Sequence, residues 1–292
     1  MLKARKYKVV DVFTHKPLLG NPVAVVLDAD GLDAAAMQRI ARWTNLSETT
    51  FVVPPTTPGA DYRLRIFTPH TELPFAGHPT LGSAHAALEA GLVTPAGGKL
   101  VQECGVGLID LAVFGVGPDQ HLSFRLPPAG LSPLDSGDID ELESLLGHAI
   151  SREVAPAIVD VGAVWLVAQI SSVSALLALE PDLARSAAFE RRLGITGISV
   201  FAPRRATGAA IEVRSFAPSS GVGEDPVCGS GNGAVAVLRR ERGLTPAGGA
   251  TYTASQGQRV GRDGLVEVEI DGNGEVVLGG SCVTCVEGIL RC

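Results

Sequence analysis

The sequence predicts an α+β protein made of two similar domains that arose by internal duplication. A strand, a Pro/Gly-rich turn and a helix occur in this order at residues 67–91 and again at residues 216–243. Residues 46–54 also align with residues 195–203. The same offset in residue number aligns Arg65 and Phe67 of the following strand with Arg214 and Phe216. Matches of this length and order indicate a duplicated domain rather than a short-period solenoid.

The individual elements follow from hydrophobic periodicity and from turn residues. In the first half we expect helices at 33–43 and 79–90, and strands at 7–13, 22–27, 49–53, 62–67, 99–103, 108–113 and 121–126. In the second half we expect helices at 139–146, at 173–193 with a break near Pro181, and at 231–242, with strands at 157–161, 164–168, 198–201 and 210–216. Four short strands follow around Tyr252, Val266, Val277 and Val283.

Residues 127–137 are rich in Pro, Gly and Ser and are the best candidate for a linker. The predicted domains are therefore residues 1–127 and residues 128–292. Two similar domains that face each other create a cleft, which is a common place for a small-molecule site.

Composition excludes several classes of function. The chain has 292 residues, of which 46% are hydrophobic, so a well-filled core is expected rather than disorder. The net charge of −7, without a basic or aromatic stripe, argues against nucleic-acid binding. Apolar runs are too short to span a bilayer, and the first residues do not resemble a secretion signal. We expect a soluble cytoplasmic protein that does not bind membranes.

The five cysteines do not form a disulfide framework in a chain of this length. Cys282 and Cys285 form a single C-x-x-C in a predicted strand, where residues three apart point to opposite faces. A second C-x-x-C is missing, so buried or incidental thiols are favoured over a zinc or redox site. No metal site is expected.

The repeated turn is the best candidate for an anion site. A helix start leaves backbone N–H groups without partners and carries partial positive charge. Gly77 and Gly229 would let the backbone approach a ligand, and His78 and Ser230 would be polar side chains at the two helix caps. One such turn is more often only a helix start, but two matched copies favour a site for a carboxylate or an enolate-like charge.

The two halves differ where chemistry would need it. Glu48 stands at the beginning of a predicted strand, where the other half has Gly197. An apolar neighbourhood favours the neutral form of a carboxyl group, so Glu48 could take up and return a proton. On position alone, an exposed strand-start glutamate is the favoured interpretation. His78 and Asp225 flank the two glycines and could orient such a proton carrier.

Four blocks of the sequence resemble the PhzF-like family of phenazine-biosynthesis isomerases. The blocks are residues 11–14 with residues 20–25 (Gly20-Asn21-Pro22 and the three that follow), residues 45–52, residues 73–82 and residues 224–230, and they stand in the family's order and spacing. The resemblance covers essentially the whole chain. It implies a fold similar to diaminopimelate epimerase, in which each of two pseudo-symmetric domains is a curved, mostly antiparallel sheet wrapped around a central helix.

The same resemblance implies further features of the fold. The central helices would be residues 79–90 and 231–242, and the last strand, at about residues 280–292, would return to the first domain. A homodimer that uses neither a metal nor an organic cofactor is also implied.

The resemblance also assigns roles to the candidate residues. The family's type member isomerises trans-2,3-dihydro-3-hydroxyanthranilate by moving a proton between ring carbons. By motif, Glu48 would be the acid and base, and His78 and Asp225 would assist it. Ser230, with the amides of Gly77 and Gly229, would hold the substrate carboxylate, and Asn21 would also belong to substrate binding. The motifs do not identify which small carboxylate this chain uses.

Cys228 departs from the family pattern, which has Thr at this position. The run Cys228-Gly229-Ser230-Gly231 resembles the turn of related racemases and epimerases that carry a catalytic cysteine. A thiol at a helix N-terminus should have a lowered pKa and could act as a base. Those enzymes need a second cysteine, and the matching position here is Ala76. An amino-acid or hydroxy-acid epimerase that uses Cys228 is therefore the first alternative, and a carboxylate-binding protein without turnover is the second.

Overall fold

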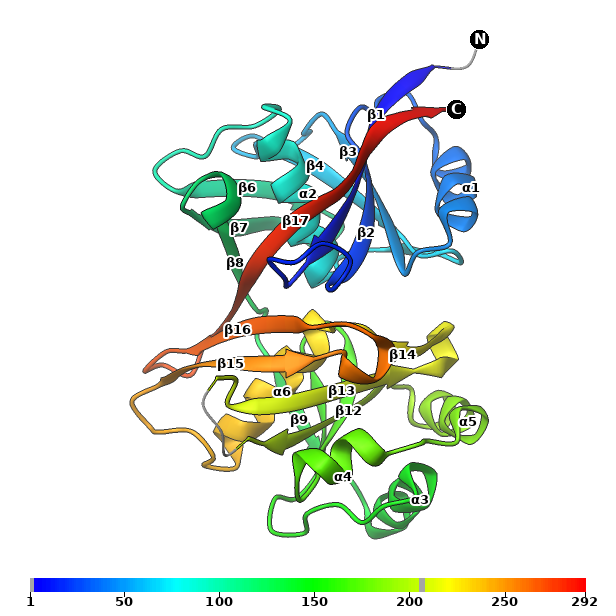
Figure 1. Cartoon of the computed structure of the whole chain (residues 1–292), viewed down its shortest axis with the longest axis vertical. Helices are drawn as coiled ribbons and strands as arrows, with labels where there is room; N and C mark the ends of the chain where they lie inside the picture. The colour runs from blue at the N-terminus through cyan, green and yellow to red at the C-terminus, as the bar shows by residue number, and fades with distance from the viewer. Residues whose placement is uncertain (1–2, 205–207) are drawn as a thin grey trace. The chain divides into compact units, whose positions relative to one another are not determined.

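The computed structural model describes residues 3–204 and 208–292, and these residues form two compact units (Figure 1). Unit 1 contains Met1–Phe124 and Gly279–Cys292, and unit 2 contains Arg125–Leu278. The chain thus passes from unit 1 to unit 2 at the end of one strand and returns inside its last strand. Each unit has its own sheet and its own buried helix.

Unit 1 is built from nine strands and two helices among its described residues. The strands are β1 (Ala4–Val12), β2 (Asn21–Val26), β3 (Glu48–Val53), β4 (Tyr62–Phe67), β5 (Glu72–Leu73), β6 (Lys99–Cys104), β7 (Gly107–Phe114), β8 (His121–Arg125) and the end of β17 (Val276–Arg291). The helices are α1 (Ala34–Thr44) and α2 (Gly77–Glu89), with a short 3₁₀ turn at Gly117–Asp119.

The sheet of unit 1 is mostly antiparallel and encloses α2. Strand β1 pairs antiparallel with both β17 and β2, while β2 with β3 and β4 with β6 are parallel pairs. Antiparallel pairs join β3 to β4 and β6 to β7 to β8. Helix α2 is buried along nearly its whole length. Figure 1 shows α2 among the strands of unit 1. At Gly82 a Cβ atom would lie 2.4 Å from Val23 Cγ1, so glycine permits this close contact between helix and sheet.

Unit 2 contains the remaining described strands and helices. The strands are β9 (Gly130–Pro133), β10 (Ala157–Asp160), β11 (Val164–Gln169), β12 (Gly197–Pro203), β13 (Ile211–Ala217), β14 (Val222–Asp225), β15 (Ala250–Gln256), β16 (Gly264–Ile270) and the start of β17. The helices are α3 (Ser136–Leu146), α4 (Val173–Ala178), α5 (Leu183–Leu193) and α6 (Gly229–Glu241), with 3₁₀ turns at Pro218–Ser220 and Gln258–Val260.

The sheet of unit 2 repeats the order of pairings found in unit 1. Strands β11 with β12 and β13 with β15 are parallel pairs, and antiparallel pairs join β9 to β10 to β11, β12 to β13 and β15 to β16. Helix α6 is buried and packs against β10, β11, β12 and β16. A second apolar cluster joins α3, α4 and α5 to the other side of the sheet.

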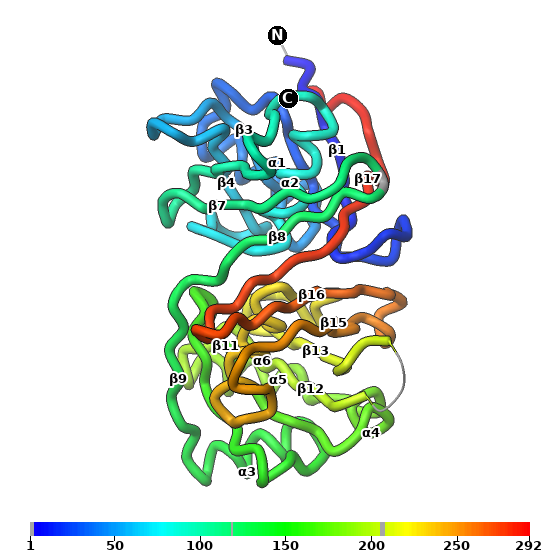
Figure 2. Tube along the Cα trace, turned by 90° about the vertical axis from the view of Figure 1, so that its left-hand side faces the viewer, coloured from blue at the N-terminus to red at the C-terminus, as the bar shows by residue number. Residues whose placement is uncertain are grey.

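The structure confirms a mixed fold dominated by curved sheets, with the predicted order of strands and helices. The identical order of parallel and antiparallel pairings supports an internal duplication, which stays an inference. The break near Pro181 is confirmed, because α4 ends at Ala178 and α5 begins at Leu183. The tube in Figure 2 follows β1 and β17 side by side in unit 1, where Ala4 pairs with Arg291.

Two predictions are wrong: the linker at residues 127–137, and the separate strands around Val277 and Val283. The stretch expected to be a linker contains β9, which pairs with β10, and the beginning of α3. Its Pro and Gly residues are compatible with this because β9 is a short strand, and Asp135 caps α3 by accepting a hydrogen bond from the Asp138 amide. The two runs around Val277 and Val283 form one continuous strand, β17.

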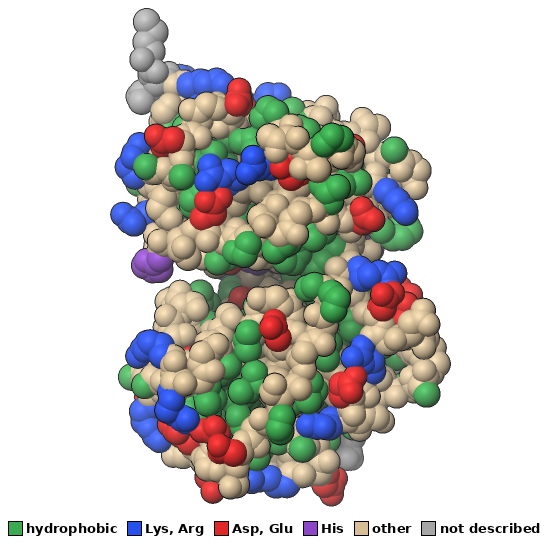
Figure 3. Space-filling model, turned by 180° about the vertical axis from the view of Figure 1, so that it is seen from behind, with side chains coloured by type: hydrophobic (Ala, Val, Ile, Leu, Met, Phe, Trp, Pro, Cys, Tyr) green, Lys and Arg blue, Asp and Glu red, His purple; other side chains and the backbone are tan. Residues whose placement is uncertain are grey.

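The surface carries charges of both signs. On the face of each unit that Figure 3 presents, acidic and basic side chains are interspersed rather than gathered by sign. Among the described residues, none of the helices has the length and apolar character that crossing a membrane requires.

Candidate active site

Three of the predicted site residues lie together in unit 1. Asn21 begins β2, Glu48 begins β3, and His78 is the second residue of α2. The parallel pairing of β2 with β3 sets Val23 beside Glu48, and α2 packs against both strands. Asn21 and His78 are buried and Glu48 is half-buried, so the three polar side chains meet where little water reaches them.

These side chains form a chain of polar contacts. Asn21 Nδ2 lies 3.5 Å from His78 Nδ1, and His78 Nε2 lies 3.5 Å from Glu48 Oε2. Burial lowers the pKa of His78 to about 3, so its ring is neutral at physiological pH. An Asn21 amide that donates to Nδ1 would place the single ring proton on Nε2, on the side of Glu48.

A neutral histidine of this kind can assist proton transfer without carrying a charge itself. Its Nε2 is the ring atom that lies beside the carboxyl group of Glu48. The structure thus brings Glu48, the predicted proton carrier, within 3.5 Å of His78, the residue predicted to assist it; the two roles stay predictions.

Gly77 has a packing role that the sequence did not suggest. A Cβ atom at this position would lie 2.8 Å from Phe124 Cζ, so the absence of a side chain leaves room for the aromatic ring. As the first residue of α2, Gly77 also has an amide that the helix itself does not satisfy. Glycine at this position therefore allows the Phe124 ring to pack against the start of α2.

The remaining predicted residues lie on one turn of unit 2, residues 225–230, between β14 and α6. Cys228 has extended backbone angles and is the N-cap of α6, and its Sγ accepts a hydrogen bond from the Gly231 amide at 3.2 Å. In unit 1 the N-cap is Ala76. The expectation that His78 and Ser230 are the caps is therefore wrong, because each is the second residue of its helix.

Asp225 has a carboxyl group that titrates near neutral pH. Burial raises its pKa to about 6, although the Val227 amide and the Cys228 thiol donate hydrogen bonds that act in the opposite direction. A carboxyl group with this pKa exchanges protons readily at physiological pH. Asp225 and Cys228 are thus coupled through a direct side-chain contact.

Ser230 is oriented by a residue that the sequence did not single out. Trp165 Nε1 donates a hydrogen bond to Ser230 Oγ at 3.0 Å, and Cys228 Sγ lies 3.6 Å from the same hydroxyl. Trp165 lies on β11 opposite Gly197, where a Cβ atom would lie 2.7 Å from Trp165 Cζ3. In unit 1 the corresponding pair of strands carries Val23 and Glu48. The glycine thus makes room for an indole where the other unit has a carboxylate.

Two further buried side chains hold this turn and were also missed. Arg214 on β13 contacts Glu224, the neighbour of Asp225, and Gln256 on β15 contacts both Asp225 and Cys228. Alignment of the halves did show Arg65 over Arg214, so the repeated arginine was a usable signal. Gln256 had no such signal, because its partners are distant in the sequence.

The C-x-x-C cysteines lie away from these groups in sequence, on β17. Burial raises the pKa of Cys282 and of Cys285, so both thiols stay protonated at physiological pH. Among the described residues no group of three or more His, Cys, Asp and Glu side chains could hold a metal ion.

Comparisons with known proteins identify the family. The family model for phenazine biosynthesis-like proteins, PhzC-PhzF, matches residues 10–288. The chain is 42% identical over 290 residues to antisense-enhancing sequence 1 of Schizosaccharomyces pombe, covering 97% of both chains. It is 36% identical over 281 residues to trans-2,3-dihydro-3-hydroxyanthranilate isomerase of Pseudomonas chlororaphis, covering 92% of this chain and 95% of the relative.

The fold is similar to a solved structure from the same family. The PhzF-family phenazine biosynthesis protein of Bacillus anthracis superimposes with a TM-score of 0.87 at 24% identity, covering 99% of both chains. Family match, curated relatives and fold agree with each other over nearly the full chain. This chain therefore belongs to the PhzC-PhzF family of phenazine biosynthesis-like proteins and is an isomerase of the PhzF type.

Proposed function

We propose that this protein is a cofactor-independent isomerase that moves a proton on a small substrate bearing a carboxylate, with Glu48 as acid and base. The observation that carries the proposal is the Asn21–His78–Glu48 chain of contacts in unit 1, with a buried neutral imidazole beside the carboxylate. The relatives named trans-2,3-dihydro-3-hydroxyanthranilate isomerase support this compound as the first substrate to test.

The proposed reaction is a two-step proton transfer. The ionised Glu48 takes a proton from a carbon of the substrate, and the electron pair of the broken C–H bond delocalises into the conjugated system. The protonated Glu48 then returns the proton to a different carbon, so the substrate is isomerised without oxidation or reduction. His78 stabilises the carboxylate form through its Nε2–H, and Asn21 keeps the imidazole in that tautomer.

Residues of unit 2 are proposed to bind the substrate's carboxylate and to assist. The Ser230 hydroxyl and the Gly229 amide suit a carboxylate because helix N-termini offer unsatisfied donors. Asp225, with its pKa of about 6, is proposed as a second group that can accept or release a proton. The positive end of the helix dipole favours the same negative charge.

The decisive test is the exchange of substrate hydrogen with solvent. Wild-type protein should incorporate deuterium from heavy water into trans-2,3-dihydro-3-hydroxyanthranilate, read by mass, and Glu48→Gln should lose this activity by about a thousandfold or more. Glu287→Gln is the matched control, because Glu287 lies in the same unit with 73% of its side chain exposed. Retention of exchange by Glu48→Gln would exclude Glu48 as the proton carrier.

An epimerase that uses Cys228 is the second candidate, favoured by one specific observation. The Cys228 thiol is itself the cap of α6 and accepts from the Gly231 amide, an arrangement that stabilises a thiolate. In this reaction the Cys228 thiolate would take the proton from a carbon next to the carboxylate, and return of a proton to the opposite face would invert that carbon. The position that a two-cysteine racemase would need in unit 1 carries Ala76.

Thiol chemistry separates the two candidates. Cys228→Ser should abolish inversion if the thiol is the base, whereas isomerisation through Glu48 should persist. Cys285→Ser provides the control for loss of a thiol elsewhere.

A protein that binds carboxylates but exchanges no hydrogen would instead fit a binding function. The homodimer implied by the family resemblance also stays a prediction, which sedimentation velocity can check.

A further inference from the structure

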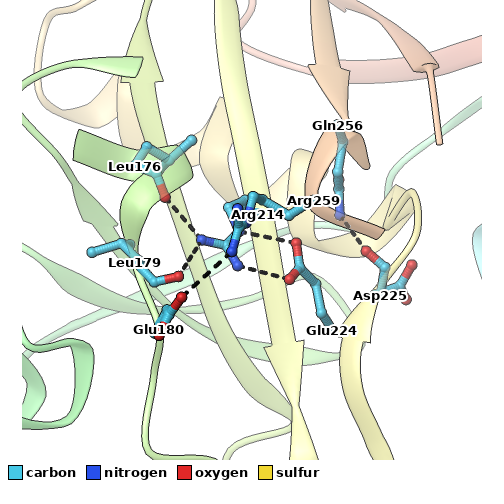
Figure 4. Close-up of polar contacts among 8 residues, drawn as sticks. All are labelled: Leu176, Leu179, Glu180, Arg214, Glu224, Asp225, Gln256 and Arg259. Carbon is cyan, nitrogen blue, oxygen red and sulfur yellow. Dashed lines mark hydrogen bonds and ion pairs between the residues drawn. The ribbon is translucent and has the colours of Figure 1, made fainter. Parts of the chain in front are cut away.

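The turn at residues 225–230 is held by side chains that lie outside it. Arg214 forms a two-pronged salt bridge with Glu224, with Nε 2.9 Å from Oε1 and Nη2 2.8 Å from Oε2 (Figure 4). The other terminal nitrogen, Nη1, donates to the carbonyls of Leu176 and Leu179 at 2.9 and 2.8 Å. Arg214 is only 4% exposed, so a buried cation is fully engaged by four acceptors.

This salt bridge acts on the turn through the backbone. Glu224 directly precedes Asp225 in β14, a strand of four half-buried residues. The pairing of β14 with β13 is short and its register shifts between Ser215 and Ala217. Because few backbone bonds fix β14, the Arg214–Glu224 pair is an important side-chain contact at the beginning of the turn.

Gln256 holds both ends of the turn with one amide group. Its Nε2 donates to the Asp225 carbonyl at 3.0 Å, and its Oε1 accepts from the Cys228 amide at 3.1 Å. Asn232 Nδ2 donates both to Gln256 Oε1 and to the Cys228 carbonyl, each at 2.8 Å. Gln256 and Asn232 are each 1% exposed. The network is therefore dry and its members have few alternative partners.

We propose that Arg214 and Gln256 are positioning residues that hold Asp225 and Cys228 in a fixed place relative to the N-terminus of α6. This inference rests on the proposed function, in which the same turn binds and assists the substrate. Neither residue needs to contact the substrate. Their effect is to fix the geometry of the turn before the substrate arrives, and displacements of about 1 Å can lower rates by about a hundredfold.

Unit 1 contains a matched salt bridge that allows a control. Arg65 on β4 binds Glu72 with Nε and Nη2 each 2.7 Å from a carboxylate oxygen. Both arginines also lie over a phenylalanine two residues later, at 5.2 Å for Phe67 and 4.9 Å for Phe216. The unit 1 side chains are 23% and 41% exposed, whereas Arg214 and Glu224 are 5% and 12% exposed. Solvent screening should make the unit 1 pair weaker.

The experiment compares Arg214→Lys with Arg65→Lys in the full chain. Lysine keeps the positive charge but cannot form the two-pronged bond. Hydrogen–deuterium exchange followed by mass spectrometry should show about a tenfold loss of protection in peptides that span residues 222–232 of Arg214→Lys. Peptides that span β12 (Gly197–Pro203) should be unchanged, and Arg65→Lys should leave residues 222–232 as protected as in the wild type.

A kinetic readout distinguishes positioning from general destabilisation. With trans-2,3-dihydro-3-hydroxyanthranilate as the probe, Arg214→Lys should lower kcat by about tenfold to a hundredfold and change KM by less than about threefold. Glu224→Gln tests the same bond from the other side and replaces Arg214→Lys if that variant does not fold. Gln256→Glu keeps the acceptor oxygen but removes the donor to Asp225, and should lower kcat in the same way.

Failure of the inference and failure of the proposed function are distinguishable. If wild-type protein exchanges no hydrogen with the probe, the proposed function fails, and the protection of residues 222–232 alone decides the inference. If Arg214→Lys keeps both the wild-type protection of residues 222–232 and the wild-type kcat, the inference is wrong. Loss of protection throughout unit 2 in both Arg214→Lys and Glu224→Gln would also overturn it, because the salt bridge would then support the whole unit.

Discussion

Trp165 Nε1 donates a hydrogen bond to Ser230 Oγ at 3.0 Å, which links β11 to the first turn of α6. The contact depends on Gly197, the residue opposite Trp165 on β12. In unit 1 the equivalent neighbours are Val23 and Glu48. Unit 2 therefore has an indole N–H donor beside the start of its central helix, whereas unit 1 has a carboxylate. The two units share a strand arrangement but differ in the chemical groups at this place.

Trp165→Phe should keep the ring in place but remove the donor to Ser230. We expect a loss of about 0.5–1.5 kcal/mol in the free energy of unfolding, measured in urea, because one largely buried hydrogen bond disappears. Under the proposed function, KM for trans-2,3-dihydro-3-hydroxyanthranilate should also rise, since the Ser230 hydroxyl is no longer oriented. In a double-mutant cycle Ser230→Ala should add little to Trp165→Phe. If the losses of unfolding free energy in Trp165→Phe and Ser230→Ala simply add in the double variant, the hydrogen bond does not contribute to stability.

Gly197→Ala should destabilise the protein through steric overlap. A Cβ atom there would lie 2.2 Å from the Phe216 carbonyl oxygen and 2.7 Å from Trp165 Cζ3. Overpacking of this kind costs about 1–3 kcal/mol of unfolding free energy, measurable by urea denaturation. Gly248→Ala is the control, because a Cβ atom at Gly248 meets nothing within 4 Å. Equal stability of both variants would contradict the packing argument.

His78 should make stability depend on pH in the acid range. Its pKa is about 3 in the folded protein and 6.5 as the ordinary value, so below pH 6.5 the unfolded chain binds a proton that the folded protein does not. This contribution is fully present above pH 6.5 and is lost as the pH falls toward 3, at about 1.4 kcal/mol per pH unit. His78→Gln should reduce the slope of the unfolding free energy against pH by about 1.4 kcal/mol per pH unit, which corresponds to the uptake of one proton on unfolding. The same change at the exposed His70 controls for loss of a histidine as such.

Asp225 should have the opposite effect over an overlapping range. Its pKa is raised from 3.8 to about 6, so the folded protein binds a proton that the unfolded chain has already released. The stabilising contribution is fully present below pH 3.8 and is lost as the pH rises through 6, at up to about 1.4 kcal/mol per unit. Asp225→Asn keeps an acceptor for the Val227 amide and should flatten this part of the profile. An unchanged profile between pH 4 and pH 6 would show that Asp225 titrates normally.

Much of the fold was predictable because its signals are local. Apolar runs and Pro/Gly turns indicated the strands and both buried helices, and the matched order of residues indicated the duplication. The strands β5 and β14 were missed because segments of two and four residues carry no periodicity. The strand β9 was missed because Pro and Gly in a short edge segment resemble a linker.

The candidate site was predictable in its residues but not in its contacts. Glu48, His78 and Asn21 were named from the sequence, yet their contact depends on how β2, β3 and α2 pack together. The caps were wrong because helix boundaries depend on backbone angles, which made Cys228 rather than Ser230 the capping residue. Trp165 and Gln256 were missed because their partners lie 65 and 28 to 31 residues away in the chain.

The long strand β17 has a consequence for how unit 1 can fold. Strand β1 pairs with β17 from Ala4 with Arg291 to Val12 with Cys282, so this part of the sheet joins segments far apart in the sequence. Pairings of such separation form slowly because a long loop must close first, and one edge of β1 stays unpaired until β17 arrives. Unit 2 is one continuous stretch, Arg125–Leu278, and needs no pairing of this separation. We therefore expect unit 1 to complete its sheet later than unit 2.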